Sequence, residues 1–393
     1  MPTSFPLDVL ALTKALVAMD TRNPSLVPDA PGESECAAFL AGVLDEWGCA
    51  TVLEAVAPGR HNVIARIGPP GKDPLILNGH LDVVGVDGMT HSPFIPHEHE
   101  GSVYGRGTTD MKGGIAAMCV AAASAALENR LHREVIITAV CDEEFASIGT
   151  RHLLANGLRA NGAIITEPTR LAVVPAHKGF VWIEVALTGR AAHGSRYDVG
   201  IDANRQAAHL LVALDRFERD VLATRTHPLL GRSSLHAPMI SGGTGWSTYA
   251  DSCTVRIERR TLPGETDLQV IHEVRALIEE LQGQDVHFTA TASIECAQPP
   301  LAMASDAPLV SAMVRACQSQ QLEGRISGLS CWTDAALFAE AGIPAICFGP
   351  GDIARAHSAT EWVEIEQLRA AERALSQLIS TDTIFTDTHS TKA

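Results

Sequence analysis

The segment Pro74-Leu75-Ile76-Leu77-Asn78-Gly79-His80-Leu81-Asp82 decides the fold, because it joins a buried strand to ionisable residues at the strand's end. Residues 74–77 form an apolar run without alternation, which is typical of a strand covered on both faces. Side chains two positions apart in an extended segment point to the same face, so His80 and Asp82 should project together. Such a strand carries its chemistry at its carboxyl end.

Strands and helices alternate in the first half of the chain, and the same alternation returns near its end. Alternating strands and helices predict an α/β fold, with a parallel or mixed sheet flanked by helices. We expect strands at 62–67, 74–77, 134–141, 162–166 and 344–348, and helices at 113–127, 307–320 and 334–341.

The middle of the chain has a different, βαββαβ-like pattern of α+β type. Its expected strands are 180–187, 253–259 and 286–294, and its expected helices are 202–222 and 267–281. We therefore predict a first domain from residues 1–178 and 298–393, interrupted by an inserted α+β domain at 179–297. The polar tail 381–393 is expected to fray.

Composition excludes several classes of function. The chain has 393 residues, a formal net charge of −16 and no basic stripe, which argues against a nucleic-acid partner. No signal peptide and no uninterrupted apolar stretch of membrane-spanning length is present, which argues against a membrane partner. The nine cysteines are scattered without a C-x-x-C pair, so we expect free thiols in the cytoplasm.

Ionisable residues follow each predicted strand of the first domain, and in open α/β sheets such residues converge in one crevice. Two histidines with four or five of these carboxylates suit two divalent ions, and a mixed nitrogen and oxygen environment without cysteine favours zinc, with cobalt or manganese as substitutes. The residues are His80, Asp82, Asp110, Asp142, Glu143, Glu144, Glu167 and His357.

Each of these residues also has a simpler interpretation. His80 could be a half-buried, hydrogen-bonded histidine, and Asp110 could stabilise a helix N-terminus. Residues 142–144 could form a solvated acidic turn, and Glu167 could be an exposed loop residue. The joint pattern favours a metal site, because carboxylates that converge without a cation repel one another and shift each other's pKa.

Five motifs resemble those of the M20 family of dinuclear metallohydrolases, in the same order and over nearly the whole chain. That family includes acetylornithine deacetylase, succinyl-diaminopimelate desuccinylase, aminoacylases and glutamate carboxypeptidase. The resemblance implies a zinc-peptidase-like catalytic domain with a mostly parallel sheet, and an inserted lid domain that mediates dimerisation. The motifs are Gly79-His80-Leu81-Asp82-Val83-Val84, Gly105-Arg106-Gly107 through Asp110-Met111-Lys112-Gly113, Asp142-Glu143-Glu144, Thr166-Glu167-Pro168, and Gly349-Pro350-Gly351 through Ala356-His357.

The resemblance also implies a ligand set for two metal ions, with Asp110 as the bridging carboxylate. One ion would be held by His80 and Glu167, and the other by Glu144 and His357. The peptide bond between Asp110 and Met111 would be cis.

Two further carboxylates would support the chemistry without binding metal. Asp82 would orient the imidazole of His80 through a hydrogen bond. Glu143 would be the general base, which takes a proton from the attacking water and passes it to the leaving amine. The paired ions would lower the pKa of that water and polarise the amide carbonyl.

The inserted domain carries a second group of candidates. His193, in Gly189-Arg190-Ala191-Ala192-His193-Gly194-Ser195, resembles the family's lid histidine, which stabilises the oxyanion and in dimeric members comes from the partner subunit. Arg260 resembles the lid arginine that pairs with a substrate carboxylate, and Lys178 and Thr333 lie in similar substrate-binding contexts. The simpler interpretations are a turn histidine for His193 and a strand-edge charge for Arg260.

Two segments depart from the family pattern. Ser247 and Ala250 occupy lid positions where asparagine and proline are frequent, so no oxyanion or substrate contact is carried over to Ser247. Thr360 stands where an acidic or amide residue is frequent, close to His357.

These features predict a homodimeric, metal-dependent hydrolase of N-acyl amino acids. Acetylornithine deacetylase, an enzyme of arginine biosynthesis, is the family member that these motifs resemble most. A carboxypeptidase, an aminoacylase or a desuccinylase would use the same ligands on a short peptide or another N-acyl amino acid. A catalytically silent binding protein is disfavoured because Glu143 is present.

Overall fold

The computed structural model describes residues 5–385, and the chain separates into two compact units. The first unit contains Met1–Pro175, Met303–Ser327 and Thr333–Ala393. The second contains Ala176–Ala302 and Gly328–Trp332. The inserted domain was predicted at 179–297, and the short return segment Gly328–Trp332 was not predicted.

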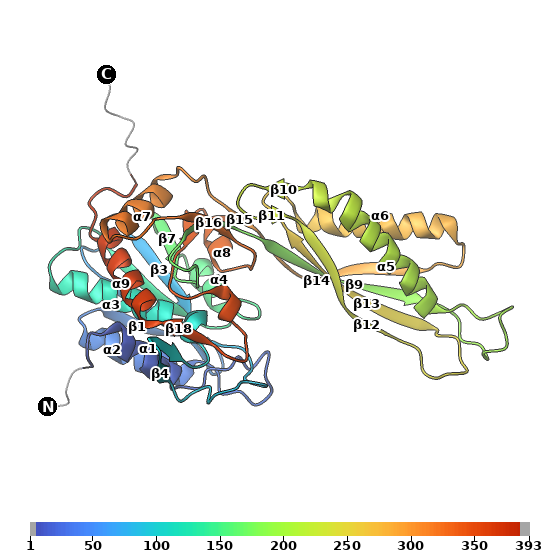
Figure 1. Ribbon diagram of the computed structural model, residues 1–393, viewed down its shortest axis with the longest axis horizontal. Helices are drawn as coiled ribbons and strands as arrows, with labels where there is room; N and C mark the ends of the chain where they lie inside the picture. The colour runs from blue at the N-terminus through green and yellow to red at the C-terminus, as the bar shows by residue number, and fades with distance from the viewer. Residues whose placement is uncertain (1–4, 386–393) are drawn as a thin grey trace, which may run out of the picture. The chain divides into compact units, whose positions relative to one another are not determined.

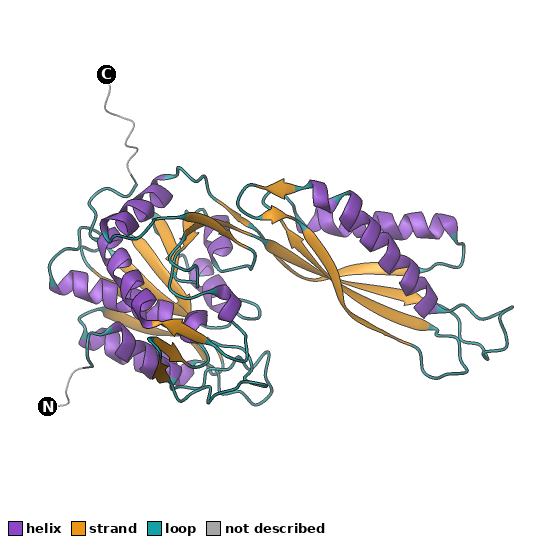
Figure 2. Ribbon diagram, viewed as in Figure 1, coloured by secondary structure: helices purple, strands orange, loops and turns teal. Residues whose placement is uncertain are grey.

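A mixed sheet forms the centre of the first unit (Figures 1 and 2). Its strands are β1 (Ala50–Ala57), β2 (Arg60–Ile67), β3 (Leu75–His80), β6 (Val135–Val140), β7 (Gly162–Ile165), β8 (Val173–His177), β15 (Leu301–Ala302), β16 (Ile326–Leu329) and β17 (Ala345–Cys347). They are ordered β1-β2-β6-β3-β7-β17-β8-β15, with β16 also paired to β8. The four strands β6, β3, β7 and β17 run parallel, which confirms the predicted mostly parallel sheet.

Helices flank this sheet. They are α1 (Val9–Val17), α2 (Ser34–Glu46), α3 (Gly113–Leu127), α4 (Ile148–Ala155), α7 (Pro308–Ser319), α8 (Ala335–Glu340) and α9 (Ile365–Ile379). Short helical turns, η1 (Thr108–Lys112) and η3 (Ile353–Arg355), and a small sheet ordered β18-β5-β4 complete the unit. The strands of that small sheet are β4 (His97–His99), β5 (Ser102–Tyr104) and β18 (Trp362–Glu364).

Helix α3 is the buried core helix of this unit. It contacts β3 and β6 on one side and α1 and α9 on the other. The continuous stretch Thr108–Leu127 is long and apolar enough to cross a membrane, but 83% of its most apolar window is buried inside the fold. Its glycines permit close packing, because a Cβ at Gly114 would overlap the carbonyl oxygen of Thr166.

The second unit is an antiparallel sheet with two helices on one face. The sheet is ordered β12-β13-β9-β14, and a separate hairpin pairs β10 with β11. The elements are β9 (Gly179–Thr188), α5 (Ala203–Asp220), η2 (Leu222–Thr224), β10 (Thr226–His227), β11 (Gly231–Arg232), β12 (Ser234–Gly242), β13 (Ser252–Thr261), α6 (Asp267–Gln284) and β14 (Ala290–Gln298). This βαββαβ order agrees with the prediction.

The sequence patterns missed or misplaced several segments. Strand β12 was not predicted, because it carries Pro238 and is mostly exposed, so it lacks an apolar alternation. Strand β14 begins at Ala290 and not at residue 286. The predicted frayed tail was wrong at its start, since Ile384 is only 2% exposed and packs in the core, whereas residues 386–393 lie outside the described residues. All nine cysteines are free thiols.

In the second unit, the carboxylate of Glu265 forms salt bridges with arginines and accepts hydrogen bonds from neighbouring groups. It pairs with Arg259 and Arg225 at 2.5 and 2.9 Å, and accepts hydrogen bonds from Ser233 Oγ and Leu262 N. Burial opposes ionisation, but these bonds prevail and hold the pKa of Glu265 below its ordinary value.

Because the folded pKa of Glu265 is depressed, its stabilisation is present above its unfolded pKa and disappears as the pH falls through its folded pKa. Glu265→Gln should lower the free energy of unfolding by about 1.5 kcal/mol at pH 7, with a smaller difference at acidic pH. Denaturant unfolding between pH 3 and 7 measures this effect. Glu279→Gln, an exposed change on α6, is the control, and a pH-independent difference for Glu265→Gln would contradict the assignment.

Candidate metal centre

The predicted ionisable residues lie together at the carboxyl ends of the four parallel strands. His80 is the last residue of β3, and Glu144 and Glu167 follow β6 and β7. Asp110 lies in η1, immediately before α3, and His357 follows η3 beyond β17. The strands are in register, with His80 paired to Val140 and Asn78 to Ile165, so their ends meet at one edge.

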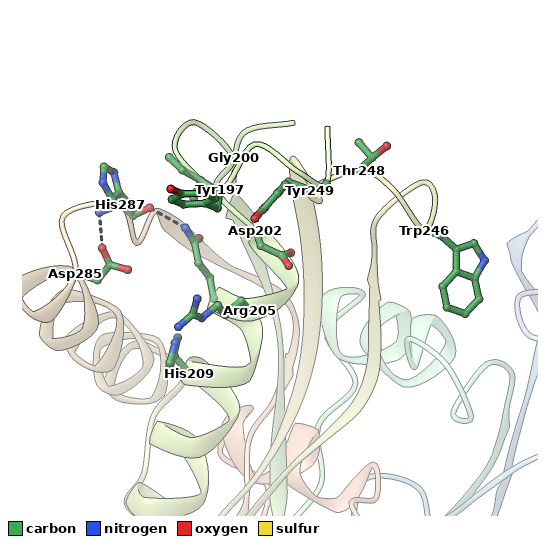
Figure 3. Close-up of a pocket in the computed structure, with 13 residues that line it drawn as sticks. Tyr197, Gly200, Asp202, Arg205, His209, Trp246, Thr248, Tyr249, Asp285 and His287 are labelled. Carbon is green, nitrogen blue, oxygen red and sulfur yellow. Dashed lines mark hydrogen bonds between the residues drawn. The ribbon is translucent and has the colours of Figure 1, made fainter. Parts of the chain in front are cut away.

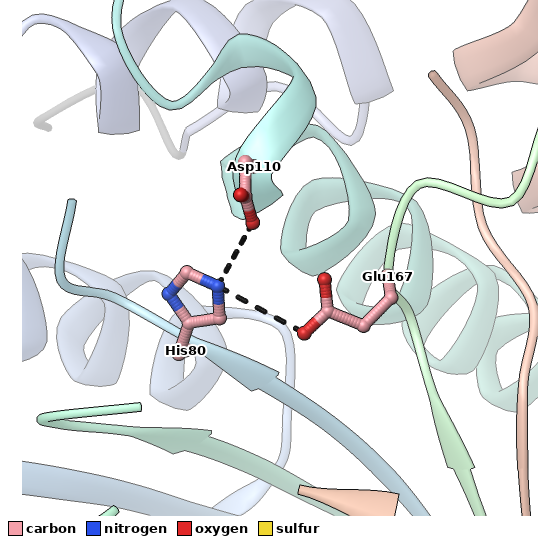
Figure 4. Close-up of side chains that lie close together, drawn as sticks. All are labelled: His80, Asp110 and Glu167. Carbon is pink, nitrogen blue, oxygen red and sulfur yellow. Dashed lines mark hydrogen bonds and ion pairs between the residues drawn. The ribbon is translucent and has the colours of Figure 1, made fainter. Parts of the chain in front are cut away.

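His80, Asp110 and Glu167 form a first candidate ligand group (Figure 4). The Nε2 atom of His80 is 3.0 Å from Asp110 Oδ1 and 3.9 Å from Glu167 Oε1. All three residues are buried. Their ligand atoms lie close enough to one another to bind one ion.

Asp110, Glu144 and His357 form a second candidate ligand group. The Nε2 atom of His357 is 3.0 Å from Glu144 Oε2 and 3.3 Å from Asp110 Oδ2. Asp110 therefore directs Oδ1 toward one group and Oδ2 toward the other, as a bridging carboxylate would. The peptide bond between Asp110 and Met111 is cis, as the resemblance implied.

Asp82 differs from its predicted role. The Nδ1 atom of His80 is 2.9 Å from the backbone oxygen of Asp82 but 3.6 Å from its carboxylate. The carboxylate instead accepts hydrogen bonds from the backbone N–H groups of Glu143 and Glu144, at 3.1 and 3.2 Å. The ring is thus oriented by the backbone, while the Asp82 side chain supports the turn that carries both glutamates.

Glu143 lies beside the two groups without belonging to either. Its Oε2 atom is 4.0 Å from His80 Nε2, farther than the oxygen of Asp110. Burial, followed by repulsion from Glu167 and Asp334, raises the pKa of Glu143 well above its usual range, although His80 opposes the rise. A carboxylate with a raised pKa that is not a ligand is suited to proton transfer.

The electrostatics of the centre favour bound cations. Burial and the charge of Asp110 raise the pKa of both Glu144 and Glu167. Burial disfavours charge on the histidines, yet their hydrogen bonds to the carboxylates raise the pKa of His80 well above normal and that of His357 to about 11. Imidazole and carboxylate donors in this number fit divalent ions that accept nitrogen and oxygen.

The sequence of residues 76–381 matches Peptidase family M20/M25/M40. The chain belongs to this family. It is therefore a hydrolase that acts on amide or peptide bonds.

Relatives of this M20/M25/M40 hydrolase have different substrates. The chain is 29% identical to N-formyl-4-amino-5-aminomethyl-2-methylpyrimidine deformylase of Bacillus subtilis, over 92% of this chain and 91% of the relative. It is 30% identical to acetylornithine deacetylase of Myxococcus xanthus, over 93% and 95% of the two chains. These two relatives therefore differ from each other in substrate.

Solved structures of M20 peptidases share the fold. A tripeptidase from Staphylococcus aureus superposes with a TM-score of 0.79 at 18% identity, covering 96% of this chain and 99% of that one. The YxeP protein of Bacillus subtilis, a dinuclear metal-binding M20 peptidase, gives 0.73 at 16% identity and covers 95% and 96% of the chains. Among residues 5–385, this chain has two candidate ligand groups that share Asp110.

Glu361 was missed by the sequence patterns, although it supports Asp110. Its fully buried carboxylate pairs with Arg106 at 2.6 Å. One carboxylate oxygen also accepts hydrogen bonds from the backbone N–H groups of Gly107, Thr109 and Asp110, at 3.0, 3.0 and 3.1 Å. The only sequence signal was the neighbouring Thr360, whose hydroxyl contacts that of Thr90.

Removing the Glu361 carboxylate should weaken metal binding. Glu361→Ala removes the acceptor of three backbone N–H groups and of Arg106 Nη1, so Asp110 loses its fixed position. We expect the affinity for Zn²⁺ to fall by about 10–100-fold, as measured by competition with a chelator. Glu361→Gln, which keeps one oxygen, should lose less, and exposed Glu366→Ala is the control. Unchanged affinity in folded Glu361→Ala protein would contradict this role.

A second unpredicted network supports the turn after β6. The amide of Asn23 donates to the carboxylates of Asp82 and Asp142, at 2.8 and 3.0 Å. Buried Arg60 pairs with Asp142 at 3.1 Å and with Glu33 at 2.5 Å. Asp142 is therefore a support of the turn, absent from both ligand groups.

In the second unit, His193 lies on an exposed loop and forms an isolated bridge with Thr248. Thr248 and Tyr249 line the pocket that is shown in Figure 3. The Nδ1 atom of His193 is 2.8 Å from Ser195 Oγ, and the neighbouring Gly194 N–H donates to the backbone oxygen of Ser247. These loops border this pocket of about 730 Å³, which Tyr197 and Arg205 also line. Both metal-ligand groups found among residues 5–385 lie in the first unit, so the role of His193 stays a prediction.

The other substrate-binding candidates have local partners. Thr333 is 1% exposed, and its hydroxyl accepts a hydrogen bond from Ala335 N, so it supports the start of α8 and does not offer a free group to substrate. Lys178 donates to the backbone oxygen of Arg232 at 2.6 Å. Arg260 is partly exposed and is considered further below.

Proposed function

We propose that the protein hydrolyses the amide bond of N-acyl amino acids, in the manner of acetylornithine deacetylase. The observation that carries this proposal is the pair of ligand groups that share Asp110, with Glu143 beside both. The proposed metal is zinc, with cobalt or manganese as substitutes. His80 and Glu167 would hold one ion, Glu144 and His357 the other, and Asp110 both.

Glu143 is proposed to move the proton in this reaction. When bound, two divalent ions would polarise the amide carbonyl and lower the pKa of water. Glu143 would take a proton from the attacking water as the new C–O bond forms. It would then give that proton to the leaving nitrogen as the C–N bond breaks, which yields a carboxylic acid and a free amine.

Residues of the second unit are proposed to complete the site. His193 would stabilise the oxyanion, in a homodimer from the partner subunit. Arg260 would bind the carboxylate of the substrate through its guanidinium group. The nine free thiols support a working location in the reducing cytoplasm.

Relatives at about 30% identity support an N-acyl substrate, because the deacetylase and the deformylase both remove a small acyl group from nitrogen. The similarity to the deformylase supports N-formyl amines as a second candidate class of substrate. The structural resemblance to peptidases supports the fold alone, at 16–18% identity.

A hydrolysis panel tests the proposal. Purified protein loaded with Zn²⁺ or Co²⁺ would be assayed with N-acetyl, N-succinyl and N-formyl amino acids and with dipeptides. We expect kcat/KM for the best N-acyl amino acid to exceed that for any dipeptide by at least about tenfold, a difference of about 1.4 kcal/mol in transition-state binding. Cleavage of dipeptides alone would overturn the proposed substrate class while leaving the family assignment intact.

A further inference from the structure

One end of the second unit's sheet presents aromatic and charged side chains on the face away from the helices. Val181 and Ile183 of β9 belong to the core under α5 and α6, so the alternate residues Phe180 and Trp182 face the open side. Phe180 is paired in register with Arg260, and Trp182 with Glu258, both on β13. These four residues and Trp332 are here called the open-face cluster.

The aromatic members form a continuous row. The ring centroids of Phe180 and Trp182 are 5.0 Å apart, and those of Phe180 and Trp332 are 6.3 Å apart. Trp332 is fixed by a hydrogen bond from Nε1 to the backbone oxygen of Pro299, at 3.0 Å. Trp182 remains 39% exposed, whereas Phe180 and Trp332 are each 9% exposed. The row therefore offers one accessible flat surface, backed by two packed rings.

Arg260 is held in place by contacts that leave the end of its guanidinium free. Its Nε atom donates to Glu258 at 2.7 Å, and its guanidinium carbon lies 5.4 Å from the centre of the Phe180 ring. The other Glu258 oxygen accepts from Trp182 Nε1 at 2.9 Å. Within residues 5–385, the two Nη groups of Arg260 have no hydrogen-bond partner. A fixed guanidinium with both Nη groups available is suited to a carboxylate.

Further cations lie near Arg260. Burial lowers the pKa of Lys178, and the neighbouring Arg232, Arg260 and Arg259 lower it further, although Glu265 opposes the fall. These cations would add to the attraction of a substrate carboxylate to the free Nη groups of Arg260.

A cavity beside Trp182 has room for a side chain of aromatic size. Its volume is about 440 Å³, within the range of small-molecule pockets. Pro238 and Met239 contribute apolar walls, and His236, Arg256, Glu258 and Glu295 contribute polar ones. A flat apolar group would replace water there and stack on the indole of Trp182.

We propose that the open-face cluster selects N-acyl amino acids with an aromatic side chain, by binding the α-carboxylate at Arg260 and the ring at Trp182. This inference rests on the proposed function, because it assigns the substrate class of the same amide hydrolase. Phe180 and Glu258 act as positioning residues for Arg260.

The test compares N-acetylphenylalanine, N-acetylalanine and N-acetylornithine as substrates of the full-length, metal-loaded enzyme. The phenylalanine derivative should have a kcat/KM at least about tenfold above that of the ornithine derivative. Trp182→Ala should abolish most of this preference, because kcat/KM should fall much more for N-acetylphenylalanine than for N-acetylalanine. Trp182→Phe should retain the preference, which separates stacking from the hydrogen bond to Glu258. Leu268→Ala, an exposed apolar truncation on α6, should leave the preference unchanged.

The outcomes distinguish the two proposals. Equal or greater turnover of N-acetylornithine, or an unaltered preference in Trp182→Ala, would overturn the aromatic assignment and leave the amide-hydrolase proposal standing. Failure to hydrolyse any N-acyl amino acid would contradict the proposed function. Equilibrium binding of the same compounds would then decide the inference, since tighter binding of the phenylalanine derivative that depends on Trp182 supports it, and equal binding refutes it.

Discussion

Glu143→Gln should retain both metal ions while kcat falls by about 10²–10⁴-fold, the usual contribution of a general base. The amide of glutamine keeps the size of the side chain but cannot accept a proton from water at neutral pH. The Glu143 carboxylate belongs to neither ligand group, so its neutralisation should leave the metal-binding residues in place.

The neighbouring residue provides a matched comparison. Glu144 Oε2 is 3.0 Å from His357 Nε2, so Glu144→Gln should reduce the bound metal toward one ion per chain. Metal analysis and initial rates on both variants would separate proton transfer from metal binding. Unchanged turnover in Glu143→Gln would eliminate it as the base, and loss of an ion from that variant would assign it to the ligands.

Strand positions could be predicted well where burial on both faces produced an apolar run. The expected strand at 74–77 corresponds to β3 (Leu75–His80), and the expected helix at 113–127 has the same bounds as α3. Strand β1 was missed because it is largely exposed, and its sequence lacks the continuous apolar run of the central strands. The sheet edge therefore could not be recognised from local pattern.

Side chains that meet at strand ends could also be predicted, because topology alone brings them together. His80, Glu144 and Glu167 lie where the parallel strands end. Glu361 and Asn23 could not be found in this way, because their partners are backbone N–H groups and the carboxylates of distant loops. The direction of the Asp82 carboxylate likewise depends on the fold of the turn at 142–147, which local sequence does not determine.

Asp110→Asn should have the most severe effect on metal binding. Replacing one carboxylate oxygen by an amide N–H₂ removes an acceptor and places a donor in the centre. Oδ1 faces His80 and Oδ2 faces His357, so an asparagine can offer an oxygen to only one of the two groups. We expect at most one ion per chain and a loss of activity above about 10³-fold, since several kcal/mol of transition-state stabilisation would disappear.

Metal stoichiometry, measured with a matched surface variant, makes this prediction decisive. Exposed Asp306→Asn carries the same chemical change outside the centre and should bind two ions with full activity. Unfolding measurements on metal-free protein would show whether Asp110→Asn folds, so that lost metal is not confused with lost structure. Two tightly bound ions in folded Asp110→Asn protein would contradict the bridging role.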